Sequence, residues 1–429
     1  MRSLSRRRFA RLLGLSTSAA LFPDTALAHA ERDLDPRPLP PTPQSPDERY
    51  WNQVRARFTL PRDFAFLNAA NLCPTPLPVL EALERNTRLL DADPSSAMRG
   101  RMGQGREASR KLLAEFLGVT PETIVIARNT SEANNFVSSG LQLGAGDEVV
   151  VFGDNHPSNL AAWREKARRF GFTVVTVPLV DPHPGPEHYL DAFRRALTAR
   201  TKLIGFTHVT NTVGDRFPAE ELCRLARERG VLSLVDGAQT FGVLEVRLDR
   251  MRPDFYTGSA HKWLCGPKEM GLLYVSPEAQ DRLWPSVIGL YPGAVGVSQR
   301  FEGMGQRDEA ALATLGEAVV FQNGIGRTAI ERRSLELAQA LMEGVRKLDG
   351  VTVHTPTSAE RSAAVVALRV GSLDPRKLAS ALYEKDRIAC AVRGGEDRPG
   401  IRFSPHIYNT MAEVDRVVIA LRKYLASGV

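Results

Sequence analysis

The sequence has few of the residues and patterns that mark several common protein classes. It has only four cysteines in 429 residues, and no two of them have the CxxC spacing of metal or redox sites. We expect buried thiols here, although one disulfide bridge stays open as an alternative. No HExxH, P-loop or strand-following GxGxxG pattern is present, so metal-dependent hydrolysis, nucleoside triphosphate use and dinucleotide binding lack support. We predict no metal site.

Long apolar runs and extended basic runs are also missing. The most apolar segment near the N-terminus, Leu12 to Phe22, is shorter than the ~20 residues of a membrane span, so no stable membrane anchor is expected. Most of the net charge of +7 lies in residues 1–28, which hold five arginines against one aspartate. The remainder has no basic run with interleaved aromatic residues, and nucleic acid is therefore not an expected partner.

The first 28 residues have the features of an export signal. Ser5-Arg6-Arg7-Arg8-Phe9-Ala10 resembles the twin-arginine motif, and Ala26-Leu27-Ala28 offers a cleavage site of small residues. An ordinary secretory signal and a basic amphipathic helix are the alternatives. We predict a periplasmic or secreted protein whose partner is the twin-arginine export machinery. This machinery carries folded proteins, which suits an enzyme that acquires its cofactor in the cytoplasm.

The remaining chain predicts an α/β protein with two subdomains. At 43% hydrophobic residues it can bury a large core, and single cores stop growing near ~250–300 residues. We predict a Pro-rich arm or linker over 29–66, a large cofactor-binding domain over 67–309 and a small α+β domain over 310–429. Apolar runs alternate with helical stretches in the large domain, which indicates a mainly parallel sheet with helices on both faces. Its predicted strands are Thr123–Ala127, Glu148–Phe152, Thr173–Val177, Lys202–Thr207, Val231–Val235, Asp254–Tyr256 and Gly271–Val275.

Asp236 and Lys262 carry the clearest chemical signal. Asp236 ends an apolar run, and Lys262 follows 26 residues later in Ser259-Ala260-His261-Lys262, just after another run. Both therefore lie at the carboxyl ends of predicted strands, where α/β sheets bind ligands. Pyridoxal 5′-phosphate (PLP) needs a lysine amine for its Schiff base and a carboxylate for its pyridine nitrogen. Taken singly, the aspartate could cap a helix and the lysine could extend from a loop.

Further polar residues follow other predicted strands. Thr130 and Ser131 open a predicted helix whose N-terminal amides would bind phosphate, although a plain N-cap explains them as well. His156 could stack on a pyridine ring or be structural, and Asn211 could contact the cofactor or form a turn. Gln239 lies three residues after Asp236. Together these strand ends predict a PLP site.

With these motifs the chain resembles the class V aminotransferase group of fold-type I PLP enzymes, within it the isopenicillin N epimerase-like and cysteine desulfurase-like branches. The resemblance runs from about Asn68 to the C-terminus. It implies a homodimer in which Lys262 binds PLP, Asp236 pairs with the pyridine nitrogen and His156 stacks on the ring. It further implies that Gln239 and Asn211 contact the phenolic oxygen. The residues implied to hold the phosphate are Thr130, Ser131, Ser259 and His261.

The resemblance also suggests how a substrate is held and where this chain departs from the family. Arg402 matches the family's carboxylate-binding arginine, and Asn71 matches a residue that assists it. Desulfurases carry a catalytic cysteine in the interval that is Gly394–Pro399 here, and this interval has none; Cys390 is expected in the core. Gln306 stands where many relatives have a threonine that donates to the phosphate of the partner subunit.

We therefore expect an exported, homodimeric PLP enzyme that acts at the amino-bearing carbon of an amino acid or a peptide-linked amino acid. Lys262 would serve as its general acid or base. Epimerisation, transamination and oxidative decarboxylation stay open, and maturation of an exported natural product is attractive by analogy. The alternatives are a C–S lyase or cysteine desulfurase, and a non-catalytic protein that binds PLP or amino acids.

Overall fold

The computed structural model describes residues 39–182, 184–289, 295–358, 360–393 and 398–429. The predicted twin-arginine leader, its cleavage site and residues 394–397 lie outside the described residues. Within these ranges, no helix combines the length and apolar character needed to cross a bilayer.

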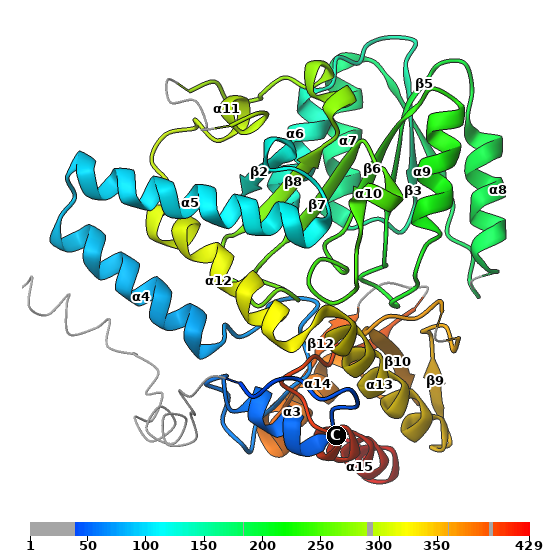
Figure 1. Cartoon of the computed structure of the whole chain (residues 1–429). Coiled ribbons are helices and arrows are strands. Elements are labelled where there is room, and N and C mark those ends of the chain that lie inside the picture. The colour runs from blue at the N-terminus through cyan, green and yellow to red at the C-terminus, as the bar shows by residue number, and fades with distance from the viewer. Residues whose placement is uncertain (1–38, 183, 290–294, 359, 394–397) are drawn as a thin grey trace, which may run out of the picture.

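A seven-stranded sheet forms the centre of the large domain, in the order β2-β8-β7-β6-β5-β3-β4 (Figure 1). Neighbouring strands from β7 to β4 are parallel, and β8 runs antiparallel to both β7 and β2. The predicted mainly parallel sheet is confirmed. The strand predicted over Asp254–Tyr256 begins one residue later and continues to Ser259, the residue that precedes the Ala260-His261-Lys262 segment. The strands are β2 Ile124–Ala127, β3 Glu148–Phe152, β4 Thr173–Val177, β5 Thr201–Thr207, β6 Leu232–Asp236, β7 Phe255–Ser259 and β8 Gly271–Val275.

Helices cover both faces of this sheet because alternate strand residues point to opposite sides. In β3, Val149 and Val151 belong to one buried cluster, whereas Val150 and Phe152 belong to the other. The first cluster includes residues of α6 (Thr130–Gly140) and α7 (Pro157–Phe170). The second includes residues of α5 Ser96–Leu117, α8 Pro186–Ala196, α9 Ala219–Glu228 and α12 Glu309–Ile325. Figure 1 shows α5 and α12 side by side, with α4 (Leu77–Ala92) next to them.

The small domain is an antiparallel sheet in the order β12-β13-β10-β9, with helices packed on it. Within the apolar run Ile388–Val392 the chain changes strand partner at Cys390. Before it, β11 pairs in parallel with β1, and after it, β12 pairs with β13. The remaining elements are α3 Glu48–Arg55, β1 Ala65–Phe66, α13 Arg327–Arg346, β9 Val351–Val353, β10 Val366–Val370, α14 Pro375–Asp386, β11 Ile388–Ala389, β12 Ala391–Arg393, β13 Gly400–Phe403 and α15 Met411–Ser427.

The two domains meet along α12 and α13, which Gly326 separates in a conformation with φ of +93°. The buried residues of α12 pack in the larger core, whereas those of α13 join the small core from Leu337 onward. Ala65 and Leu67 from the N-terminal side also lie in the small core. The domain boundary predicted at residue 310 was based on a change in the sequence pattern. In the structure, residues of α13 pack in both the larger and the small core.

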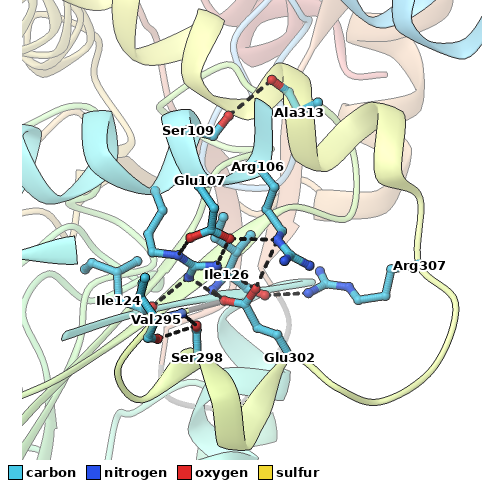
Figure 2. Close-up of polar contacts among 11 residues, drawn as sticks. Arg106, Glu107, Ser109, Ile124, Ile126, Val295, Ser298, Glu302, Arg307 and Ala313 are labelled. Atoms are coloured by element: carbon cyan, nitrogen blue, oxygen red, sulfur yellow. Dashed lines mark hydrogen bonds and ion pairs between the residues drawn. The ribbon is translucent and has the colours of Figure 1, made fainter. Parts of the chain in front are cut away.

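A buried ion network ties α5 to β2 and to α11 (Ser298–Phe301) (Figure 2). Arg110 donates from Nη1 and Nη2 to the two carboxylate oxygens of Glu302 at 2.6 and 2.8 Å. Both side chains are fully buried. Ile126 N–H also donates to Glu302, and Arg110 reaches Glu107 and the carbonyl of Ile124. Burial alone would lower the pKa of Arg110, but the hydrogen bonds and charge of Glu302, then Glu107, raise it. The charges of Arg110 and Glu302 are thus matched within the protein, and the pair links α5 to the end of α11.

Candidate active site

The residues singled out from the sequence gather at the carboxyl ends of β3, β5, β6 and β7. Asp236 is the last residue of β6, and Lys262 lies three residues after β7 ends. His156 follows β3, and Asn211 lies in the turn after β5. Arg402, on β13 of the small domain, reaches the carbonyl of Asn211. The site therefore lies where the small domain meets the ligand-binding edge of the large sheet.

Lys262 is held in a position that favours its neutral amine. Burial is the main cause that lowers its pKa to about 8, and the positive charge of Arg402 adds to this effect. The carboxylate of Asp236 acts in the opposite direction. A lysine that must attack a carbonyl carbon needs a free amine, so this pKa suits Schiff-base chemistry at neutral pH. By contrast Lys268, the other lysine nearby, donates to the carbonyl of Cys73 and the hydroxyl of Thr75.

Asp236 is buried, and its carboxylate is oriented by two asparagines that the sequence analysis did not single out. Asn134 and Asn159 donate from their amides to Oδ2 of Asp236 at 2.9 and 3.2 Å. Thr257 fixes the amide of Asn134 by donating to its oxygen, and Ala238 N–H donates to Oδ1 of Asp236. Donors from three elements thus fix the orientation of the carboxylate, whose remaining lone pairs can accept from a pyridine N–H.

Thr130 and Ser259 meet at the N-terminus of α6. Thr130 N–H donates to Oγ of Ser259 at 3.0 Å, and the two hydroxyls are 2.8 Å apart. Asn129 caps the helix by accepting from Glu132 N–H. Close packing requires Gly271, because a Cβ there would lie 2.5 Å from the carbonyl of Gly258 and 2.8 Å from Cα of Asn129. Hydroxyls and amides at a helix N-terminus form an anion site.

The two histidines predicted for the site lie near this helix end. His261 has a buried Nδ1 without a hydrogen-bond partner in the described structure, and burial lowers the pKa of its ring to about 4. His156 shares its Nδ1 with Ser158, whose hydroxyl also contacts Ser131. The His156 side chain is exposed, but protein surrounds part of it. Partial burial is the main cause that lowers the pKa of its ring, and the positive charge of Lys262 is the next cause. A neutral ring with an open side can stack on another ring.

Gln239 and Asn211, both predicted to contact the phenolic oxygen, are placed differently. Trp263 donates from Nε1 to the amide oxygen of Gln239 at 2.8 Å, which fixes the amide orientation because indole is only a donor. The Gln239 nitrogen then donates to the carbonyl of Ala70, and one of its two hydrogens stays available. Asn211 is partly exposed, and its carbonyl accepts from Arg402.

Arg402 is a buried guanidinium group, and among the described residues it contacts only neutral oxygens. Its Nη1 donates to the carbonyl of Asn211 at 2.7 Å, and its Nη2 to Oδ1 of Asn68 at 3.2 Å. Its Nε is buried without a partner in that part of the chain. Burial, followed by the charge of Arg393, lowers the pKa of Arg402 to about 10. Such a cation is costly unless an anion is bound.

Asn71 and Gln306 are both exposed in the described structure. Asn68, in the same turn as Asn71, contacts Arg402, and the predicted role of Asn71 in holding the substrate carboxylate stays a prediction. Gln306 accepts from Arg99 and donates to Glu309 and to the carbonyl of Arg307, so its amide is engaged at the surface of its own chain. The predicted contact of Gln306 with a partner subunit stays a prediction.

These residues fit PLP. The helix end with Thr130 and Ser259 supplies donors for a phosphate, and the unpartnered Nδ1 of His261 lies in the same segment as Lys262. The oriented carboxylate of Asp236 can accept from a pyridinium N–H. No cluster of acidic, histidine or cysteine side chains suited to a metal ion occurs among the described residues.

Comparison with known proteins gives consistent matches over most of the chain. A family model described as aminotransferase class-V matches residues 65–417. Isopenicillin N epimerase from Streptomyces clavuligerus is 32% identical over 387 residues, covering 86% of this chain and 97% of the relative. A probable cysteine desulfurase from Methanothermobacter thermautotrophicus is 30% identical over 408 residues, covering 87% and 98%. The apo structure of the cysteine desulfurase from Thermococcus onnurineus NA1 matches with a TM-score of 0.80 and 26% identity, covering 90% of this chain and 99% of that one.

Proposed function

Because the chain belongs to the class-V aminotransferase family and is a PLP-dependent enzyme, we propose that it acts at the amino-bearing carbon of an amino acid or a peptide-linked amino acid, as an epimerase or aminotransferase does. The observation that carries the proposal is the buried, carboxylate-free guanidinium of Arg402 beside Lys262 and Asp236. It supports a substrate that brings a carboxylate next to its amine.

When bound, PLP supplies an electron sink for negative charge at the amino-bearing carbon. The protein contributes three actions. The carboxylate of Asp236, oriented by Asn134 and Asn159, would accept from the pyridine N–H. The amine of Lys262 would take a proton from the substrate carbon or return one, and its pKa of about 8 suits both directions near neutral pH. Arg402 orients the substrate through its carboxylate.

A cysteine desulfurase is the main alternative, because several relatives carry that description. Desulfuration needs a mobile thiolate that reaches the substrate sulfur. Cys390 packs against the small core between β11 and β12, and burial raises the pKa of its thiol to about 12. No cysteine occurs between Arg393 and Arg402 in the sequence. These facts favour the epimerase-like and aminotransferase-like chemistry. A non-catalytic binding protein would need neither Lys262 nor Asp236.

The proposal includes export and dimerisation. Ser5-Arg6-Arg7-Arg8-Phe9 supports passage of the folded, PLP-loaded protein through the twin-arginine pathway to the periplasm or beyond. Changing Arg6 and Arg7 to lysine should leave folded holoprotein in the cytoplasm, and unchanged periplasmic accumulation would exclude this route. An enzyme there could mature an exported natural product. Sedimentation of the holoprotein tests the proposed homodimer.

The proposed chemistry is tested by the absorption spectrum of purified holoprotein with a panel of amino acids and α-amino peptides. An amino compound that enters the site changes the cofactor band. Isotope exchange at the amino-bearing carbon in deuterated water then reports proton transfer by Lys262. A cofactor band with no response to any member of the panel, and no exchange, would contradict the proposal.

A further inference from the structure

Arg393 lies on the same face of the small sheet as Arg402. In the antiparallel pair of β12 and β13, Ala391 is opposite Arg402 and Arg393 is opposite Gly400. Opposite residues share a face, and so do residues two apart along a strand. Arg393 is therefore the diagonal neighbour of Arg402. Because its cross-strand neighbour is a glycine, no side chain opposite it covers this position.

Arg393 has no hydrogen bond or ion pair with any described residue, although it is only partly exposed. Asp154, whose charge acts on Arg393, is bonded elsewhere: its Oδ2 accepts from Nη2 of Arg398 at 3.1 Å and from the hydroxyl of Thr212. Burial lowers the pKa of Arg393, the charge of Asp154 raises it, and Arg398 lowers it further. Like Arg402, its guanidinium therefore has no bonded carboxylate among the described residues.

Arg393 also lies close to the reacting groups. Its charge is among those that lower the pKa of His156, after burial and Lys262. It also lowers the pKa of Arg402. Asp154, two residues before His156, joins β3 of the large domain to Arg398 of the small domain, so that both domains border the same region. Arg393 thus lies close enough to His156 and Arg402 for its charge to act on both.

Among the described groups, Arg402 and Arg393 both lack a bonded carboxylate. Under the proposed function Asp236 would pair with the pyridine nitrogen and the α6 end would hold the PLP phosphate, while Asp154 is bonded to Arg398. Arg402 takes one carboxylate under the proposed function, and Arg393 stays unmatched among the described groups. A lone strand arginine solvated by water is the plain alternative. The shared face, partial burial and open cross-strand position favour a ligand.

We propose that Arg393 binds a second anionic group of the substrate, so that the enzyme prefers amino acids or α-amino peptides with a carboxylate distal to the one held by Arg402. This inference rests on the proposed function and narrows its substrate class. A distal amide, which has the same shape but no charge, would leave Arg393 unmatched. The preference for a carboxylate over an amide would then have two sources: the ion pair with the carboxylate, and the cost of leaving Arg393 without an anion when the amide binds.

The test compares pairs that differ only in the distal charge: L-glutamate with L-glutamine, L-aspartate with L-asparagine, and L-γ-glutamylglycine with its C-terminal amide. The concentration giving half of the change in cofactor absorption measures binding to the holoprotein. In the wild type, the carboxylate member of at least one pair should bind about 10- to 150-fold more tightly. Arg393→Gln should reduce this preference to about 2-fold while leaving amide binding unchanged, and Arg393→Lys should retain part of it.

Arg369→Gln is the matched control, because Arg369 lies on β10 of the same sheet but is exposed and bonded to the carbonyl of Gly371. This variant should keep the wild-type preference. Equal binding of both members of every pair in the wild type would overturn the inference alone, as would a preference that survives in Arg393→Gln. If neither member of any pair changes the cofactor absorption, the proposed function fails as well.

Discussion

Arg110 and Arg402 are both buried guanidinium groups, but only Arg110 has a carboxylate as its partner. Glu302 and Glu107 raise the pKa of Arg110 against the effect of burial, whereas burial and Arg393 lower that of Arg402 to about 10. The first cation is matched within the protein by Glu302 and Glu107, which Figure 2 shows with the strand residues beside them. The second contacts neutral oxygens only, in the region that the structure describes. The difference distinguishes a structural ion pair from a buried cation that, under the proposed function, binds the substrate carboxylate.

Removal of the carboxylate partner should have the largest effect on stability. Glu302→Gln leaves Arg110 charged and buried, so we expect the free energy of unfolding to fall by ~3–5 kcal/mol. Arg402→Met removes a buried charge that no carboxylate offsets, and it should leave that free energy within about 1 kcal/mol of wild type or raise it. Urea unfolding of the cofactor-free proteins measures both.

Glu84→Gln provides the control for charge removal, because Glu84 pairs with Arg88 on the exposed face of α4. It should change the free energy of unfolding by less than ~0.5 kcal/mol. The comparison fails if Arg402→Met destabilises the protein as much as Glu302→Gln does, since Arg402 would then be a structural group like Arg110.

The pH dependence of PLP uptake should report the charges around Lys262. Only the neutral amine attacks, so the uptake rate of cofactor-free protein should rise with pH and level off above about 8. An ordinary lysine would continue to gain neutral amine up to ~10.4 and would have ~10²-fold less of it at pH 7.5. The folded pKa of Lys262, about 8, lies below its unfolded value of ~10.4. Protonation of Lys262 therefore costs stability in the folded state, and this cost decreases as the pH rises from about 8 to ~10.4.

In Arg402→Met, the midpoint of PLP uptake should move to higher pH, since a positive neighbour that lowers the Lys262 pKa is gone. Absorption of the bound cofactor measures the rate. A pH midpoint of PLP uptake near the pKa of free lysine in the wild type would show that Lys262 is not the attacking amine, or that water reaches its amine in solution.

Substitution of Arg402 by lysine keeps the charge but removes the fork that binds a carboxylate through two hydrogen bonds. Losing a charge-assisted bond of ~1.5–3 kcal/mol should weaken substrate binding about 10- to 150-fold, with an unchanged cofactor spectrum. Titration of the holoprotein with the best substrate gives the value. Native kinetics of Arg402→Lys on carboxylate substrates would refute the assigned role.

The smallest effect is expected at Cys390, although its thiol lies close enough to Arg402 to influence the arginine's pKa. Cys390→Ser should change turnover of the true substrate by less than about 2-fold, because a buried neutral thiol takes no part in the chemistry. L-cysteine should yield no catalytic sulfide or alanine. Sustained sulfide release that is lost in Cys390→Ser would place the chain with the desulfurases.

Local sequence patterns predicted most strands of the large sheet and singled out residues that the structure gathers at its ligand-binding edge. Strands such as Glu148–Phe152 are short apolar runs followed within a few residues by polar ones, and a parallel sheet brings such ends to one edge. Asp236 and Lys262 could be found because both follow such runs. The break at Cys390 could not be found, because one apolar run serves two sheets and only the partner strands, β1 and β13, reveal the change.

Residues that act through long-range pairing were missed. Asn134 lies 102 positions before Asp236, and Glu302 lies 192 positions after Arg110. An asparagine inside a helix or a glutamate after one gives no local signal of its partner. Asn134 does lie one helical turn after Thr130, on the same face of α6, and that spacing was the available clue. Asn68 was not singled out, although it lies in the same turn as Asn71 and contacts Arg402.

The central claim is that Lys262, beside Asp236, is the lysine that binds PLP. Reduction of the holoprotein with borohydride, followed by proteolysis and peptide mass mapping, tests it directly. We predict that the phosphopyridoxyl group is found on the peptide containing Lys262, and that Lys262→Ala loses it while Lys268→Arg retains it. A label on Lys268 or any other lysine would contradict the account.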